Sequence, residues 1–159
     1  MKTPRRDPSG VLLGSIGVDD ARVLRDRVLR AGHSPGGSVY PGDDAADTGH
    51  FGAFVDARLV AVASVCREAP RTELGETAAT VWRLRGMATA DGYRGRGIGE
   101  RLARRCIAHA RGHGATRVWC SARERAVGFY ERLGFRVVGE PYELRQFSNE
   151  RYIEMHLAV

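Results

Sequence analysis

The most informative segment of the chain is Arg94-Gly95-Arg96-Gly97-Ile98-Gly99, which separates a predicted strand from the most regular predicted helix. The strand covers residues 80–89, and the helix covers residues 97–112 with apolar residues at i, i+4 spacing. The first N–H groups of a helix lack intrahelical partners and lie at the positive end of its dipole, so glycines there let an anion approach. The segment therefore predicts a phosphate-binding turn, with Arg94 and Arg96 at its rim.

Two other glycine-rich motifs do not fit this turn. The dinucleotide fingerprint G-x-G-x-x-G, started at Gly95, would need its third glycine at position 100, which is Glu100. The second motif, the Walker phosphate loop, needs a lysine beside its glycines.

The only lysine of this chain is Lys2, near the N-terminus. Its position excludes a Walker loop, and it also excludes an enzyme that forms a Schiff base on a buried lysine.

The remaining pattern predicts a mixed α and β chain. Amphipathic helices are expected over residues 19–31 and 124–133, and strands over residues 51–55, 59–66, 80–89, 117–120, 135–138 and 152–159. Strand, glycine turn, helix and strand in the middle of the chain form a βαβ unit, which requires one parallel strand pair beside the N-terminal hairpin. The glycine- and proline-rich residues 32–49 predict a loop, and residues 67–79 a connector.

Length and composition predict one globular domain over residues 1–159, with residues 1–10 as a flexible tail. The chain has 43% hydrophobic and 28% charged residues, and 25 basic against 19 acidic residues give a net charge of +6. This charge favours a polyanionic partner such as a phosphate-bearing cofactor, nucleic acid or acidic lipid. No signal peptide or membrane span is visible, so we expect a cytoplasmic protein.

No metal site is expected. The cysteines are odd in number, widely spaced and embedded in apolar runs, which predicts core thiols at Cys66, Cys106 and Cys120. The histidines show no spacing typical of metal ligands.

The C-terminal residues 152–159 predict a half-buried strand. Their apolar members alternate with Tyr152, Glu154 and His156. Pairing of this strand with a second copy of the chain would produce a homodimer, an alternative that the sequence leaves open.

Three segments together resemble the GNAT-type N-acetyltransferases: Leu84-Arg-Gly-Met-Ala-Thr89, the glycine turn at residues 94–99, and Ala126-Val-Gly-Phe-Tyr-Glu-Arg-Leu-Gly-Phe135. The resemblance spans residues 51–138. It implies a central, mostly antiparallel sheet with one splayed parallel strand pair, flanked by helices. It also implies transfer of an acetyl group from acetyl-coenzyme A to a primary amine of a small molecule or peptide, by direct attack in a ternary complex.

The same resemblance implies roles for individual residues. The backbone of Met87, Ala88 and Thr89 would pair with the pantetheine arm, and residues 94–99 would surround the pyrophosphate. Ser121 stands where many relatives have a cofactor contact, often an asparagine. Tyr130 aligns with the tyrosine that protonates the departing thiolate, and its ordinary pKa of about 10 keeps it protonated at neutral pH. From the residues alone, the favoured role of Tyr130 is to complete the core stripe of its helix, and the resemblance shifts the preference to catalysis.

The sequence identifies neither a general base nor an acceptor. The acidic residues near the predicted site are expected to be solvated surface charges: Glu68, Glu73, Glu76 and Asp91, and the loop residues Asp43, Asp44 and Asp47. A catalytically silent acyl-coenzyme A sensor or interaction module is therefore the second hypothesis. A nucleic-acid-binding domain is the third and least favoured, because no helix-turn-helix, RNA-binding or zinc-finger motif is visible.

Overall fold

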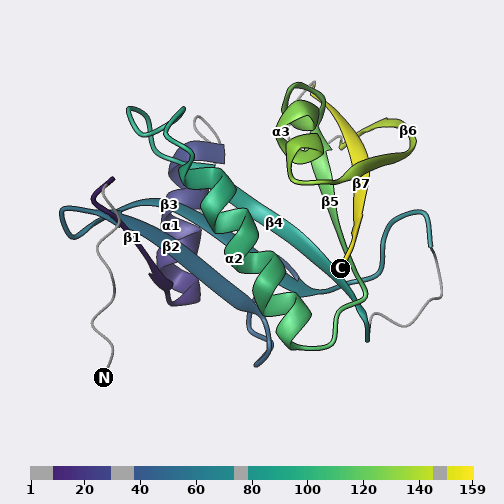
Figure 1. The fold of residues 1–159 in the computed structure, drawn as a ribbon, viewed down its shortest axis with the longest axis horizontal. Coiled ribbons are helices and arrows are strands. Elements are labelled where there is room, and N and C mark those ends of the chain that lie inside the picture. Colours follow the sequence, from purple (N-terminus) through teal and green to yellow (C-terminus); the bar gives the residue numbers. More distant parts are fainter. Residues whose placement is uncertain (1–8, 30–37, 74–78, 145–149) are drawn as a thin grey trace.

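The computed structural model describes residues 9–29, 38–73, 79–144 and 150–159 (Figure 1). Predictions for residues 1–8, part of the loop after Gly32, and Glu76 lie outside this range. The elements in chain order are β1 (Val11–Ser15), α1 (Val18–Leu29), β2 (Gly49–Val55), β3 (Arg58–Arg67), β4 (Val81–Thr89), α2 (Ile98–Gly112), β5 (Arg117–Arg123), a 3₁₀ turn (Glu124–Ala126), α3 (Val127–Arg132), β6 (Arg136–Glu143) and β7 (Arg151–Ala158).

All seven described strands belong to one sheet, in the order β1-β2-β3-β4-β5-β7-β6. Neighbouring strands are antiparallel except β4 and β5, which are parallel as predicted. The parallel pair has three residue partners and ends at Arg83 and Trp119. Beyond that point the two strands diverge, and β5, β7 and β6 turn away from the other half of the sheet (Figure 1). The predicted mixed fold with one splayed parallel pair is confirmed.

The helices α1 and α2 cover opposite faces of the sheet (Figure 1). The apolar stripe of α2 joins the main core, with Leu102, Ala103 and Cys106 fully buried. On the other face, Leu24 of α1 packs in a smaller cluster with Val62 and Ala88. Because α2 begins directly after the glycine turn, its packing fixes the position of that turn against the sheet.

Three elements differ from the sequence predictions. The edge strand β1 was not predicted, because five residues interrupted by Gly14 carry too little periodicity. The strand β6 continues to Glu143, past the predicted end at Val138, with an irregular register over the extension. The predicted 124–133 helix begins as a 3₁₀ turn before α3.

Pairing of the C-terminal strand with a second copy of the chain, which the sequence leaves open, would need a free edge on that strand. β7 lies between β5 and β6, and both of its edges are already paired within the chain. A strand without a free edge cannot add a strand from a second copy.

All three cysteines are buried and free, as predicted for core thiols. Burial raises the pKa of Cys66 to about 11 and the pKa values of Cys106 and Cys120 further, so the thiols stay protonated at neutral pH. None of the helices that the structure describes has the length and apolar character needed to cross a membrane.

A β-bulge interrupts β4 within the diverging part of the strand, shortly after its pairing with β5 ends at Arg83. The register gives two residues of β4, Gly86 and Met87, opposite the single residue Ala63 of β3. Gly86 has a φ of +64°, and a Cβ there would lie 2.6 Å from Nε of Arg25 on α1. The bulge therefore requires glycine for both conformation and space, and it lies against a buried arginine.

We predict that Gly86→Ala destabilises the protein by at least about 1–2 kcal/mol, because the left-handed conformation strains any Cβ and Arg25 must move. Urea unfolding measures the difference. The matched control is Gly14→Ala on β1, where φ is not in the left-handed range and no atom lies within 4 Å of the new Cβ. Equal free energies of unfolding for the two variants would contradict the assignment of the bulge.

Candidate active site

The divergence of β4 and β5 creates an opening in the sheet. The C-terminal part of β4 pairs with β3 on one side, whereas its pairing with β5 stops at Arg83. After Arg83, the N–H and C=O groups of β4 that face β5 are therefore not paired with β5. An extended ligand can hydrogen-bond to them as an added strand would. The predicted backbone contacts Met87, Ala88 and Thr89 belong to this part of β4.

The glycine turn lies between the end of this strand and the start of α2. Gly92, Gly95 and Gly97 have φ between 75° and 85°, and a Cβ at any of them would meet no atom within 4 Å. These residues are therefore glycines because of the backbone conformation, and the space in front of them is open. Gly97 is the N-cap of α2 and makes no side-chain cap hydrogen bond. The first N–H groups of α2 accordingly face a space that an anion can enter.

Two arginines stand on the exposed rim of this turn, as the sequence predicts. Arg94 donates from Nε to the Thr89 carbonyl at 3.2 Å and lies 3.4 Å from the Asp91 carboxylate. The guanidinium of Arg96 lies 5.2 Å from the centre of the Tyr93 ring. Both side chains are solvated, so each can move toward a phosphate at little energetic cost.

Tyr130 on α3 belongs to the core and also contacts the diverging part of β4. Its ring packs edge-on against Phe129 and Phe135, and its hydroxyl donates to Sδ of Met87 at 3.5 Å. The terminal carbon of Met87 and the ring of Phe129 in turn approach the Cβ position of Gly99 on α2. Burial raises the pKa of Tyr130, so the phenol is protonated at neutral pH. A thioether is a weak acceptor, so a stronger acceptor can take over this hydrogen bond.

Ser121 lies in a different cluster from Tyr130. In the β5–β7 register Ser121 stands opposite Glu154, on the sheet face away from the α2 core. Its Oγ receives hydrogen bonds from the hydroxyl of Tyr142 and from Arg83, the latter at 3.4 Å. The structure therefore places Ser121 beside the opening but on the side opposite the phenol.

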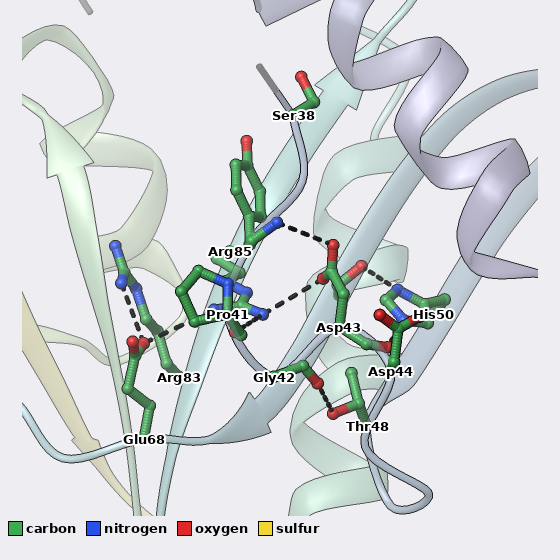
Figure 2. A network of polar contacts seen from close by, with 12 residues as sticks. Ser38, Pro41, Gly42, Asp43, Asp44, Thr48, His50, Glu68, Arg83 and Arg85 are labelled. Carbon is green, nitrogen blue, oxygen red and sulfur yellow. Dashed lines mark hydrogen bonds and ion pairs between the residues drawn. The ribbon is translucent and has the colours of Figure 1, made fainter. Parts of the chain in front are cut away.

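The acidic loop residue Asp43 is buried in an ion network, which corrects its assignment as a solvated charge (Figure 2). Its carboxylate accepts hydrogen bonds from Arg25 at 2.9 Å and from Arg85 at 3.2 Å. Burial by itself would raise the pKa of Asp43, but hydrogen bonds from Arg25 and the Tyr40 N–H outweigh it, and the pKa is lowered. The network ties the loop to α1 and to β4 next to the bulge.

The other carboxylates that the sequence places near the site are either paired with arginines or largely exposed. Glu68 lies 2.9 Å from Arg83, and Glu73 binds Arg117. Asp47 lies 2.6 Å from Arg67, so this second loop residue is also paired. The side chains of Asp44 and Asp91 are 79% and 94% exposed, as expected for solvated charges.

Sequence reasoning missed two polar residues on β7. Glu154 and His156 occupy the face that the alternating pattern assigns to solvent, yet Glu154 is 1% exposed. The connector after β3 covers this face, and Thr72 donates to Glu154. The one sequence feature that could have indicated a buried Glu154 is a carboxylate within a run of strong strand formers. The alternation of apolar and polar residues shows which residues share a face, but not what packs against that face.

His50 on β2 is held neutral inside the Asp43 network. Its Nε2 lies 2.9 Å from the Asp43 carbonyl oxygen, which only accepts, so Nε2 carries the proton. Nδ1 lies 2.7 Å from Oγ of Ser64, which accepts from Arg25 and donates to the ring. Burial lowers the pKa of His50, and the charges of Arg25 and Arg85 lower it further.

We expect the protein to lose stability as pH falls from about 7.5 to about 5.5. Because the pKa of His50 is lower in the folded state than the ordinary value of about 6.5, the unfolded state binds more protons below that pH. His50→Gln keeps a donor and an acceptor without titrating, so urea unfolding of this variant should show a weaker pH dependence. His113→Gln, at the exposed end of α2 and outside the Asp43 network, is the comparison variant. An unchanged pH dependence in His50→Gln would contradict the prediction.

Comparison with known proteins places this geometry in a family. Residues 24–135 match the family model of the acetyltransferase (GNAT) family. The chain is 35% identical over 135 residues to the uncharacterized N-acetyltransferase YitI of Bacillus subtilis strain 168, covering 85% of this chain and 89% of that protein.

Solved structures share the fold. An acyl-CoA N-acyltransferase from Pseudomonas aeruginosa has a TM-score of 0.70 at 24% identity, covering 93% of this chain and 99% of that one. An aminoglycoside 6′-N-acetyltransferase complexed with coenzyme A also has a TM-score of 0.70, at 13% identity, covering 92% and 96%. The family match and the YitI alignment together establish that the chain belongs to the GNAT family of acetyltransferases.

Proposed function

We propose that this acetyltransferase transfers the acetyl group of acetyl-coenzyme A to a primary amine of a small molecule or peptide, by direct attack in a ternary complex. One observation carries the proposal: the unpaired edge of β4 leads directly into an uncapped helix N-terminus lined by glycines. A strand edge suits the two amides of a pantetheine arm, and a helix N-terminus with nearby arginines suits a diphosphate. The fold shared with an acetyltransferase solved with coenzyme A supports this assignment.

The residues present fit such a cofactor. The backbone of Met87, Ala88 and Thr89 would hold the pantetheine arm. The turn from Arg94 to Gly99 would bind the diphosphate through the N–H groups of Gly97, Ile98 and Gly99, and Arg94 and Arg96 would add charge at the rim. Ser121 lies on the other face of β5, so its side chain is better placed toward the acceptor than toward the diphosphate. Bound acetyl-coenzyme A supplies a thioester carbonyl that an amine can attack.

In this proposal Tyr130 is the general acid for the leaving thiolate. The phenol is the polar group that α3 directs at Met87, next to the backbone expected to hold the cofactor. Its raised pKa keeps the proton in place until negative charge develops on sulfur. Since the pKa of a phenol exceeds that of a thiol, about 8.5, complete proton transfer is not downhill. The main stabilisation therefore comes from the hydrogen bond in the transition state.

The variant Gly97→Asp tests the diphosphate site. A carboxylate at the N-cap would occupy the open space before α2 and repel the diphosphate, so we expect isothermal titration to show at least about 100-fold weaker acetyl-coenzyme A binding. The control is Gly114→Asp, which has the same left-handed φ and open surroundings but lies at the other end of α2. Failure of the wild type to bind acetyl-coenzyme A would contradict the proposal, as would equal loss in both variants.

Removal of the phenol hydroxyl tests the role of Tyr130. We expect Tyr130→Phe to lower kcat for thiol release by about 100-fold while the Kd for acetyl-coenzyme A stays within about twofold. Tyr152→Phe, on the other face of the sheet, is the matched control. If the kcat of Tyr130→Phe equals that of the control, Tyr130 is a core residue and not the general acid. Tight binding by the wild type without turnover of any amine would favour the acyl-coenzyme A sensor instead.

A further inference from the structure

Glu154 on β7 is a buried carboxylate with one oxygen held and one oxygen free. Its Oε2 accepts hydrogen bonds from Oγ1 of Thr72 at 2.6 Å and from Nε2 of His156 at 2.8 Å. Its Oε1 is also buried, but it makes no hydrogen bond within the part of the chain that the structure describes. A buried carboxylate oxygen without a donor is energetically unfavourable, so this atom points to a missing ligand.

The environment fixes which atoms donate to Glu154. The guanidinium of Arg117 lies 3.3 Å from Nδ1 of His156, and a guanidinium only donates, so Nδ1 accepts and Nε2 carries the proton. His156 is thus oriented as a neutral donor to Glu154. The partners of Glu154 are a hydroxyl and an imidazole, whereas Asp43 and Glu68 each bind an arginine. A cationic ligand would complete the surroundings of Glu154.

The strand register places Glu154 one strand away from the opening between β4 and β5, on the far side of β5. It stands opposite Ser121, which hydrogen-bonds Arg83 at the point where the parallel pairing ends. This is the face of the sheet opposite Tyr130, because Cys120 and its partner Met155 point into the core around α2 and α3. Tyr130 and Glu154 therefore lie on opposite faces of the sheet, and Glu154 is next to the strand that borders the opening.

We propose that Oε1 of Glu154 binds the ammonium group of the acceptor and acts as the general base of the acetyl transfer. The proposal rests on the proposed function and extends it by naming the base. It also narrows the acceptor to an amine that is protonated in solution and enters from the face of β5 that carries Ser121.

The proton balance of the step is complete. Glu154 removes one proton from the ammonium group, and the freed lone pair forms the N–C bond as the C–S bond breaks. The sulfur leaves as a thiolate and takes a proton from Tyr130. The second proton lost by nitrogen replaces the one that Tyr130 donated, and Glu154 returns its proton to solvent. The products are an amide, a thiol and one released proton.

Charged and titratable groups surround Glu154 on its own strand and on the neighbouring strands. His156 on β7 donates to it, and Tyr142 on β6 binds the opposite residue Ser121. Burial raises the pKa of Tyr142, so this phenol stays protonated at neutral pH. Arg83 on β4 contacts Ser121, and Arg117 on β5 contacts His156. Oε1 of Glu154 makes no hydrogen bond to any of these groups.

The test compares Glu154→Gln with the wild type. A panel containing an amino sugar, an aminoglycoside, a polyamine and a peptide α-amine is first screened for thiol release from acetyl-coenzyme A. With the best acceptor we expect Glu154→Gln to lower kcat/KM at least about 100-fold at pH 7. The kcat/KM of the variant should recover as rising pH deprotonates the amine, because a neutral amine needs no base. With hydroxylamine, which is uncharged at neutral pH, the loss should be under about threefold. The matched control is Glu140→Gln, an exposed carboxylate on β6, which should behave like the wild type.

Several results would overturn the proposal. An equal loss of kcat/KM in Glu154→Gln with the amine and with hydroxylamine would assign Glu154 a structural role. Weaker binding of acetyl-coenzyme A by this variant would lead to the same conclusion. If Glu154→Gln is as active as Glu140→Gln, Glu154 is not the general base, but the proposed function still holds. A wild type that binds acetyl-coenzyme A and turns over no amine would overturn both. If Glu154→Gln does not fold, Thr72→Val replaces it. Loss of the hydrogen bond that orients the carboxylate should lower kcat/KM for the protonated amine more than for hydroxylamine, and equal effects on the two acceptors would refute the general-base role of Glu154.

Discussion

The early end of the parallel pairing between β4 and β5 is the constraint on which the rest of the structure depends. Parallel strands joined by a helix are normally paired along their length, but here the ladder ends at Arg83 and Trp119. The helix α2 lies against the β2–β4 half of the sheet, while β7 and β6 continue from β5. The consequence is a strand edge inside the sheet, next to a helix N-terminus, and these two features produce the candidate cofactor site.

The buried ion network keeps the β4 side of this opening in place. Arg25 packs against the bulge at Gly86, and Asp43 joins Arg25 to Arg85 and to the loop after α1. Burying three charges is unfavourable unless each is paired, so the network contributes more to specifying one arrangement of α1, the loop and β4 than to net stability. His50 fits the same logic, because a further positive charge there would meet two arginines.

The two faces of β5 divide the chemistry in the proposed mechanism. The α3 face presents the phenol of Tyr130, a donor with a raised pKa that remains neutral until a thiolate forms. The other face presents Ser121 and Glu154, with a carboxylate oxygen that no described residue satisfies. An acid and a base separated by a strand cannot neutralise one another directly, so each can remain in the state that its role requires.

The sequence by itself determined the features that depend on local spacing. The glycines of the turn, the stripe of α2 and the βαβ order require particular residues at fixed offsets, so they predicted the glycine turn, the helix and the parallel strand pair, while the resemblance of three motifs indicated the family. Tertiary structure alone decided which charges are buried. Asp43 lies in a polar loop and Glu154 alternates with apolar residues, so both are typical of solvated positions, yet α1 covers one and the connector after β3 covers the other. The same reason explains β7, whose place between two strands depends on contacts far apart in the chain. Periodicity shows which residues share a face, but burial depends on what packs against that face.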